Sequence, residues 1–188
     1  IKKTIGKNNN KKNKKKILED RLIKHHLYSD EKIPTTTKTR VVSRNQQMIR
    51  LDREDTFIST NDSLNFFIND FDNAFIIISD YAKGFCDDSF FEMLFNQKSI
   101  DTKVFIDPKG SNWEKYNGAF LIKPNLSELE EVYGTAIKND DDEITKSGKE
   151  VFEKYKIENL LITRGKKGMT LINKNNISHF STKNVDVY

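Results

Sequence analysis

The chain has 188 residues, of which 32% are charged, and its formal net charge is +4 at pH 7. This length suits one domain with a buried core, and the single cysteine excludes a disulfide framework and suits a reducing cytosol. No apolar run approaches the roughly 20 residues that cross a bilayer, and no secretory signal is visible. These features favour a cytoplasmic protein that does not use a membrane.

The positive charge is concentrated near the start of the sequence. The segment Lys7–Lys16, which reads KNNNKKNKKK, holds six lysines and no acid. Such a run can bind nucleic acid, but no aromatic residues or glycines separate the lysines, so a solvated helix face is the favoured interpretation. We predict a helix from Asn8 to about Arg21 and a short strand near Leu22–Tyr28. A nucleic-acid-binding module remains an alternative of a different class.

The next segment reads as two paired strands, Thr35–Ser43 and Gln47–Arg53, that are crowded with cations and amides. Because side chains alternate along a strand, Lys38, Arg40 and Arg44 would share one face. Three positive groups on one surface repel one another unless an anion lies over them. The face is therefore either a solvated edge, where cations discourage further pairing, or a site for an anionic ligand.

Helices and apolar strands alternate through the rest of the chain. We expect strands at Ala74–Ser79, Lys103–Pro108, Ala119–Pro124 and Asn159–Gly165, helices at Asn61–Asn69, Asp87–Gln97, Asn125–Gly134 and Asp140–Lys156, and hairpin strands at Gly168–Asn173 and Ile177–Thr182. Continuous apolar runs are typical of strands that are buried on both faces of a parallel sheet. The pattern predicts an α/β fold with a mainly parallel sheet flanked by helices and an antiparallel edge hairpin.

Polar residues follow four of these strands, in the segments SDYAKG, DPKG, KPNLSE and TRGKKG. Ligands of open α/β sheets bind beyond the carboxyl ends of the strands, so these segments are candidates for one site. The first two place Asp80, Lys83 and Lys109 at strand ends. The P-loop pattern does not occur. The Rossmann fingerprint does not occur either, and its absence disfavours a dinucleotide enzyme.

Two of these segments allow a structural or a functional interpretation. Asn125 is an expected N-cap, and Glu128 completes a capping box. The same helix start could hold phosphate, with Glu128 binding Mg²⁺ or its waters. Gly165 and Gly168 could form an ordinary hairpin turn or a backbone nest for the phosphates of a nucleotide.

The motifs TTTKTRVVSRNQQMIRLDRE, ISDYAKG, FIDPKGSNWEKYNGAFLIKPNLSELE and LITRGKKGMTL occur in this order. They resemble the kinase domain of the D-glycero-β-D-manno-heptose-7-phosphate kinases, which belong to the ribokinase-like (PfkB) carbohydrate kinases and are often fused to an ADP-heptose adenylyltransferase. The resemblance runs from about Ile5 to Tyr188. It implies a ribokinase-like fold with part of a small β-lid.

The resemblance also implies that residues 1–188 form a partial domain, truncated at both ends. The family's first strand and sugar-binding segment would precede Ile1. Its G-A-G-D motif, which holds the catalytic aspartate, would follow Tyr188. No catalytic residue is therefore expected within the chain, and Asp186, which lacks the flanking glycines, is not a substitute. We expect the fragment by itself to bind nucleotide weakly and to turn over no substrate.

The family's motifs imply a nucleotide site and a sugar-phosphate site, with ATP and Mg²⁺ as cofactors and Glu128 as a possible Mg²⁺ ligand through water. The implied nucleotide-binding residues are Asn125, Leu126, Ser127, Glu128, Thr163, Arg164, Gly165 and Gly168. The expected substrate-binding residues are Lys38, Arg40, Arg44, Asn45, Gln46, Asp80, Lys83 and Lys109. Cations on the strand pair would then face a substrate that already carries a 7-phosphate.

The activity implied by the resemblance is transfer of the ATP γ-phosphoryl group to the anomeric hydroxyl of heptose 7-phosphate. The product would feed ADP-heptose synthesis for the lipopolysaccharide core in the cytoplasm of a Gram-negative bacterium, and the full-length protein would be a homodimer that binds no nucleic acid. An alternative within the enzyme class is another ribokinase-like kinase, acting on an unphosphorylated sugar or on fructose phosphate.

Overall fold

The computed structural model describes residues 2–6, 10–23, 26–30, 36–44, 46–53, 55–56, 60, 63 and 75–182. The chain divides into two compact units, Ile1–Asn69 with Lys83–Phe85 and Asp70–Ala82 with Cys86–Tyr188, and each is described by itself. The predicted helix Asn61–Asn69 lies outside the described residues, apart from one position.

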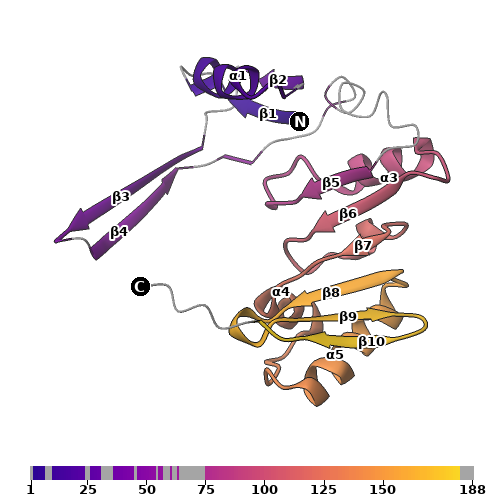
Figure 1. Ribbon diagram of the computed structural model, residues 1–188. Coiled ribbons are helices and arrows are strands. Elements are labelled where there is room, and N and C mark those ends of the chain that lie inside the picture. Colours follow the sequence, from indigo (N-terminus) through magenta and orange to yellow (C-terminus); the bar gives the residue numbers. More distant parts are fainter. Residues whose placement is uncertain are drawn as a thin grey trace. The chain divides into compact units, whose positions relative to one another are not determined.

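The first unit begins with a strand, a helix and a second strand (Figure 1). Strand β1 (Lys2–Gly6) pairs in parallel with β2 (His26–Asp30), and helix α1 (Asn10–Asp20) lies between them in the chain. The helix confirms the prediction, whereas β1 was not predicted and β2 begins later than the predicted Leu22–Tyr28. The predicted start was wrong because Leu22 lies in a turn with φ of +55°, which is outside the strand region.

The predicted strand pair is confirmed as an antiparallel hairpin of β3 (Thr37–Ser43) and β4 (Gln46–Arg53). On one face Lys38 lies opposite Asp52, and Arg40 lies opposite Arg50. The other face carries Thr39 opposite Leu51 and Val41 opposite Ile49, so it is largely apolar. The register passes from Val41–Ile49 to Val42–Gln47, which makes Met48 the extra residue of a β-bulge.

The second unit is built on a six-stranded sheet (Figure 1). Its strands are β5 (Phe75–Ser79), β6 (Lys103–Asp107), β7 (Leu121–Ile122), β8 (Asn159–Thr163), β9 (Met169–Asn173) and β10 (Ile177–Phe180). The spatial order is β10-β9-β8-β7-β6-β5, with β5 to β8 parallel and β8, β9 and β10 antiparallel. This arrangement confirms the predicted α/β class and the antiparallel edge hairpin.

Each helix of this unit begins at a capping side chain, and the predicted cap Asn125 is confirmed. Helix α3 (Asp88–Gln97) is capped by Asp87, α4 (Leu126–Tyr133) by Asn125, and α5 (Asp141–Lys154) by Asp140; each cap side chain accepts a backbone N–H from the first turn. Helix α4 ends at Gly134, whose φ of +92° is the left-handed conformation that glycine adopts without strain. Helices α3, α4 and α5 contribute buried apolar side chains to the core.

The core of this unit lies on one face of the sheet. Register places Val104, Ile106, Ile122, Leu160, Ile162 and Ile172 on that face, and all are buried. Helix α5 packs closely there, since a Cβ at Gly148 would lie 2.5 Å from Ile172 and 3.0 Å from Ile162. Burial on both faces was wrongly predicted for β5, because Phe75 and Ile77 on the opposite face are 80% and 79% exposed. Within the described ranges, no helix is long and apolar enough to cross a bilayer.

Candidate functional site

The carboxyl ends of the parallel strands form one continuous rim. Ser79 of β5 pairs with Asp107 of β6, and the backbone N–H of the following residue, Asp80, donates to the Asp107 carbonyl at 3.0 Å. Beyond the short strand β7, Asn125 forms a parallel bridge with Thr163 at the end of β8. The predicted segments that follow β5, β6, β7 and β8 are therefore neighbours, as the rule for open α/β sheets requires.

Two ion pairs join the segments of this rim. The Lys109 ammonium, after β6, lies 3.4 Å from Oε1 of Glu128 at the start of α4. The Lys123 ammonium, after β7, lies 2.7 Å from Oδ1 of Asp107. Both lysine side chains are nearly half exposed, at 49% and 42%, so a ligand with negative charge can reach them.

The start of α4 carries the predicted capping box. The Asn125 side chain accepts the backbone N–H of Glu128 at 2.9 Å, and Oε2 of Glu128 accepts the backbone N–H of Asn125 at 3.0 Å. One carboxylate oxygen therefore serves the cap, and the other faces Lys109. The positive end of a helix dipole, a carboxylate and a lysine meet at this point, and this combination suits a phosphate that carries a cation.

Asp80 has a buried carboxylate at the end of β5. Its Oδ2 accepts hydrogen bonds from the Lys115 ammonium at 2.7 Å and from the Tyr116 hydroxyl at 2.9 Å. Burial, together with the negative charge of Asp80, raises the pKa of Tyr116 well above its usual value, so this hydroxyl stays protonated and donates. The Tyr116 hydroxyl also accepts from the Lys109 backbone N–H at 3.3 Å, which connects Asp80 to the segment after β6.

The segment TRGKKG forms the hairpin turn between β8 and β9. Residues Gly165–Lys167 make one short 3₁₀ turn, and the Arg164 backbone N–H donates to the Gly168 carbonyl at 2.8 Å. Gly165 and Gly168 have φ values of +61° and +88°. Thr163 before the turn donates its backbone N–H to the Pro124 carbonyl at 2.9 Å, so the turn is held next to the start of α4.

The side chain of Arg164 is buried among partners inside the protein. Its guanidinium donates to Asn139 at 2.9 Å, to Asp141 at 2.6 Å and to Thr170 at 3.1 Å. The hydrogen bond from Arg164 lowers the pKa of Asp141. The residue is only 3% exposed, so a direct contact of the guanidinium with phosphate would require these bonds to break.

The expected sugar-phosphate cations on the hairpin lie in the first unit. The hydrogen bonds from Arg50, at 2.7 and 2.8 Å, are the main cause that lowers the pKa of Asp52, and the charges of Lys38 and Arg40 add to the effect. Asp52 is the one acid in the two strands, so this face keeps an excess of positive charge.

Arg44 does not share that face, contrary to the prediction. It lies in the turn after β3 with φ of +48°, where the strand alternation has ended. Gln46 is the first residue of β4 and pairs with Ser43, whereas Asn45 lies outside the described residues. Lys83 lies in the segment after β5, in a stretch grouped with the first unit.

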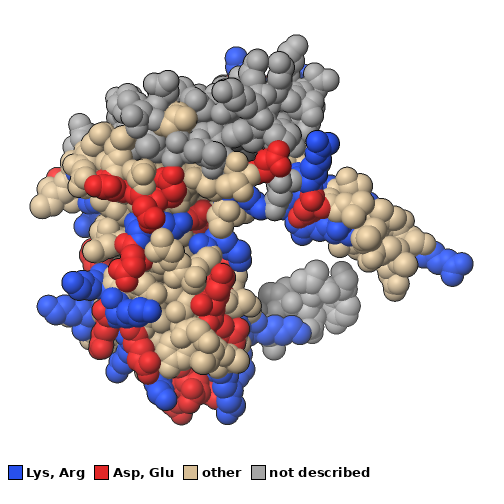
Figure 2. All heavy atoms as spheres, turned by 180° about the vertical axis from the view of Figure 1, so that it is seen from behind, with Lys and Arg blue, Asp and Glu red and all other residues tan. Residues whose placement is uncertain are grey.

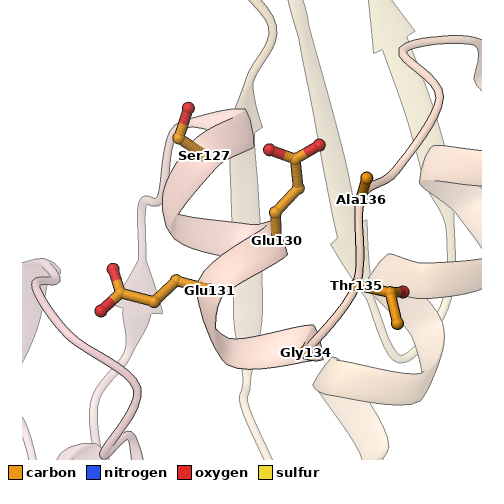
Figure 3. Close-up of a pocket in the computed structure, with 6 residues that line it drawn as sticks. All are labelled: Ser127, Glu130, Glu131, Gly134, Thr135 and Ala136. Atoms are coloured by element: carbon orange, nitrogen blue, oxygen red, sulfur yellow. The ribbon is translucent and has the colours of Figure 1, made fainter.

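A shallow hollow, open to solvent, runs along α4 (Figure 3) and is lined by Ser127, Glu130, Glu131, Gly134, Thr135 and Ala136. Glu130 accepts the Ile137 backbone N–H at 2.9 Å, and the side chain of Glu131 extends from the other side of the helix. Its carboxylates do not suit a phosphate ligand, so we place the candidate site at the rim and not in this hollow. Within the described part of the chain, no three His, Cys, Asp or Glu side chains gather as metal ligands.

The face of the second unit shown in Figure 2 carries acidic and basic side chains that are interspersed. Nucleic-acid-binding surfaces carry clustered cations instead. The predicted lysine-rich helix α1 includes an ordinary solvated pair, Lys15 with Glu19 at 3.6 Å one turn further on. These observations favour a small-molecule site over the nucleic-acid alternative.

Three residues at the rim were missed by the motif analysis: Lys115, Tyr116 and Lys123. Lys123 follows β7 directly and could have been found by the same rule that selected Lys109. Lys115 and Tyr116 lie in a short 3₁₀ turn between two strands, 35 and 36 residues from Asp80 in the sequence. No local pattern links residues at that separation.

Solved structures with the same fold belong to sugar kinases. The phosphofructokinase-2 of Escherichia coli in complex with potassium superposes with a TM-score of 0.74 at 14% identity, covering 98% of this chain and 62% of that one. The ribokinase of Giardia lamblia superposes with a TM-score of 0.75 at 12% identity, covering 97% of this chain and 58% of that one. The fold is therefore the ribokinase-like α/β fold.

Sequence comparison identifies the family. Residues 4–188 match the model of the pfkB family carbohydrate kinases, and the chain belongs to this family. It is 38% identical over 177 residues to the bifunctional protein HldE of Actinobacillus pleuropneumoniae, and 40% identical over 161 residues to that of Vibrio vulnificus (strain YJ016). These matches cover 92% and 82% of this chain. The chain spans only 37% and 33% of the length of these two relatives.

Proposed function

We propose that the chain is the nucleotide- and sugar-phosphate-binding part of a kinase for D-glycero-β-D-manno-heptose 7-phosphate. The observation that carries this proposal is the rim, where the capping box of Asn125 and Glu128 meets the lysines after β6 and β7. The motifs that resemble those of heptose kinases and the 38–40% identity to HldE proteins support this choice of substrate. In the reaction, the anomeric oxygen loses its proton and bonds to the γ-phosphorus of ATP, while the bond from that phosphorus to ADP breaks.

In this proposal the chain positions the phosphates and neutralises their charge. Phosphoryl transfer places little covalent chemistry on the protein, so positioning and electrostatic stabilisation dominate. The backbone N–H groups at the start of α4, from Leu126 and Ser127, would face the ATP phosphates, beside Thr163, Gly165 and Gly168. Arg164 would act by holding this turn in shape through its internal hydrogen bonds.

One carboxylate oxygen of Glu128 suits the expected Mg²⁺ role. Mg²⁺ is usually held by one or two carboxylates together with phosphates and water, and Glu128 presents one carboxylate oxygen outside its cap. The metal would supply charge neutralisation to the transferred phosphoryl group. Lys109, which now faces that oxygen, would then turn to the phosphates.

The remaining parts of the proposal concern residues beyond the rim. We propose that Lys38 and Arg40 with the neighbouring residues Arg44, Asn45 and Gln46 bind the sugar phosphate. The base that accepts the anomeric proton would be the aspartate of a G-A-G-D motif, which does not occur in this sequence. The product would serve ADP-heptose and lipopolysaccharide core synthesis in the cytoplasm of a Gram-negative bacterium.

The test of this function is ADP release by the protein encoded by the whole gene, with three sugars compared at equal concentration. We expect kcat/KM for heptose 7-phosphate to exceed that for unphosphorylated heptose by about 10- to 100-fold, because hydrogen bonds to charged groups contribute about 1.5–3 kcal/mol. Fructose 6-phosphate is the control for another ribokinase-like activity. A higher kcat/KM for fructose 6-phosphate or for the unphosphorylated sugar would replace the heptose assignment.

A homodimer through the β3–β4 hairpin is part of the same proposal. The apolar face of this hairpin exposes Val41 by 46%, Ile49 by 49% and Leu51 by 55%, and exposed apolar faces of this kind mark protein interfaces. We expect Leu51→Lys to shift the protein from dimer to monomer in light scattering, because a charge would be buried at the interface. The control Gln47→Lys, on the opposite face, should leave the dimer intact. Equal masses for the two variants would contradict this interface.

A further inference from the structure

The loop Tyr81–Cys86 follows β5 and has a strained backbone. Ala82 has φ of +53°, a left-handed conformation that a residue with a Cβ rarely adopts, and Gly84 has φ of +88°. Strained residues persist only where their surroundings hold them, and they gather at functional sites. This loop begins at the rim and carries Lys83 as its one cation.

The strained residue is held by Asp80, which precedes the loop. The Ala82 backbone N–H donates to Oδ1 of Asp80 at 2.7 Å. The other carboxylate oxygen, Oδ2, accepts from Lys115 and Tyr116. Only 2% of the Asp80 side chain is exposed, so both of its oxygens are fixed by partners inside the protein.

Lys115 connects the start of the loop to its end. Its ammonium donates to Asp80 at 2.7 Å and also to the backbone carbonyl of Cys86 at 2.8 Å. The ammonium lies over the rings of Phe91 and Tyr116, at 5.6 and 5.1 Å from the ring centres. A single buried ammonium, with 11% of its side chain exposed, therefore bridges the two ends of the loop.

We propose that Lys115 is a positioning residue, whose ammonium closes the loop Tyr81–Cys86 and thereby sets Lys83 for binding the phosphate of the sugar. The ligand named here rests on the proposed function, whereas the closure of the loop does not. Asp80 and Tyr116 act through Lys115 and the loop, and do not touch the substrate. The role of Asp80 is then different from the direct substrate contact that its motif suggested.

The alternative is a purely electrostatic role, in which Lys115 only neutralises Asp80. The reaction rate of the Cys86 thiol distinguishes this role from closure of the loop. Cys86 is the single cysteine of the chain. Burial, followed by the charge of Asp80, raises the pKa of its thiol to about 12, while the charge of Lys115 lowers it. Loss of that charge alone would raise the pKa further and slow the reaction of the thiol, whereas an opened loop would expose the thiol and speed it.

The experiment measures the rate at which Cys86 reacts with a disulfide reagent at pH 8. We expect Lys115→Met to react at least about 10-fold faster than the unaltered chain and Lys115→Arg, which keeps a donor, to restore most of the slow rate. Lys123→Met removes a rim lysine outside the loop and should leave the rate unchanged. A slower or unchanged rate in Lys115→Met would overturn the closure of the loop.

Lys115→Met leaves Asp80 buried without its cation and can unfold the chain. The double variant Asp80→Asn with Lys115→Met removes that charge, while the amide oxygen of the introduced asparagine can still accept from the Ala82 backbone N–H. We expect this double variant to retain the thermal midpoint more closely than the single variant. Because loss of the Asp80 charge by itself lowers the pKa of the Cys86 thiol, its reaction is compared with that of Asp80→Asn alone, and we expect the double variant to react faster. A folded double variant that reacts no faster than Asp80→Asn would contradict the proposal.

Binding measurements on the same variants test the ligand. We expect Lys115→Met to weaken binding of heptose 7-phosphate about 10-fold, because Lys83 is then no longer held in place for the sugar phosphate, and to weaken ATP binding by less. Equal losses for both ligands would overturn the positioning role. If the unaltered protein binds ATP but no heptose 7-phosphate, the proposed substrate fails, while a fast thiol reaction in Lys115→Met still supports the closed loop.

Discussion

Gly168→Ala is expected to destabilise the chain by about 3 kcal/mol, which combines an alanine held at φ of +88° and ψ of −129°, at about 1–3 kcal/mol, with a forced backbone shift at about 1–3 kcal/mol. The added Cβ would overlap the backbone carbonyl oxygen of Phe180, and the φ of +88° allows no relief without moving the turn. A backbone atom cannot rotate away as a flexible side chain can. Gly168 is therefore required by the close approach of β10 to the turn after β8.

Gly165→Ala is the matched control in the same turn. Gly165 also has a positive φ, of +61°, but a Cβ there would meet no heavy atom of the described residues within 4 Å. Only the conformational cost of about 1–2 kcal/mol remains. Urea unfolding of the two variants should give a lower midpoint for Gly168→Ala at unchanged slope. Equal midpoints would show that the turn can shift away from the Phe180 carbonyl without a loss of stability.

In the protein encoded by the whole gene, Glu128→Gln is expected to lower kcat by about 10²-fold without unfolding the protein, because loss of a positioned electrostatic partner typically costs a factor of this size. Glutamine can still accept the Asn125 backbone N–H, so the capping box survives. What is lost is the negative charge on the oxygen that faces Lys109 and that would hold Mg²⁺ through water. The free energy of unfolding should change by less than about 0.5 kcal/mol.

The control for this variant is Glu131→Gln, an exposed carboxylate on the same helix that takes no part in the capping box. Its kcat should stay within a factor of two of the unaltered protein, on the order expected for a surface change. Measuring kcat at saturating and at low Mg²⁺ separates weaker metal binding from slower transfer. A kcat for Glu128→Gln equal to that of Glu131→Gln would remove Glu128 from the mechanism.

The elements of the second unit were predictable because their signals are local. Apolar runs mark β6 and β8, and Asn125, Glu128 and Gly134 mark the two ends of α4 within ten residues. The gathering of the four segments at one rim also followed from the rule that ligands bind beyond the carboxyl ends of the strands. The exposed face of β5 was not predictable, because a continuous apolar run such as AFIIIS does not show whether one face of the strand or both faces are buried.

The buried polar contacts could not be predicted in the same way. Asp80 and Lys115 are brought together where the turn after β6 packs against α3, as in the contact of the Tyr116 and Phe91 rings. Arg164 contacts Asn139 and Asp141, which lie 25 and 23 residues earlier in the sequence. The Arg164 side chain is buried inside the protein, although its motif suggested a residue that faces the nucleotide. Arg44 was misplaced because side chains alternate faces only within a strand, and Arg44 lies in a turn with a positive φ.

Every strand of the six-stranded sheet lies beside its nearest strand in the sequence, from β5 through to β10. Contacts between such neighbours close short segments of chain, and proteins with short-range contacts fold faster than those with distant ones. Each strand after β5 therefore leaves the ribosome when its preceding partner has already been made, and the sheet can grow from β5 towards β10 during synthesis. Its assembly does not wait for a strand made later in translation.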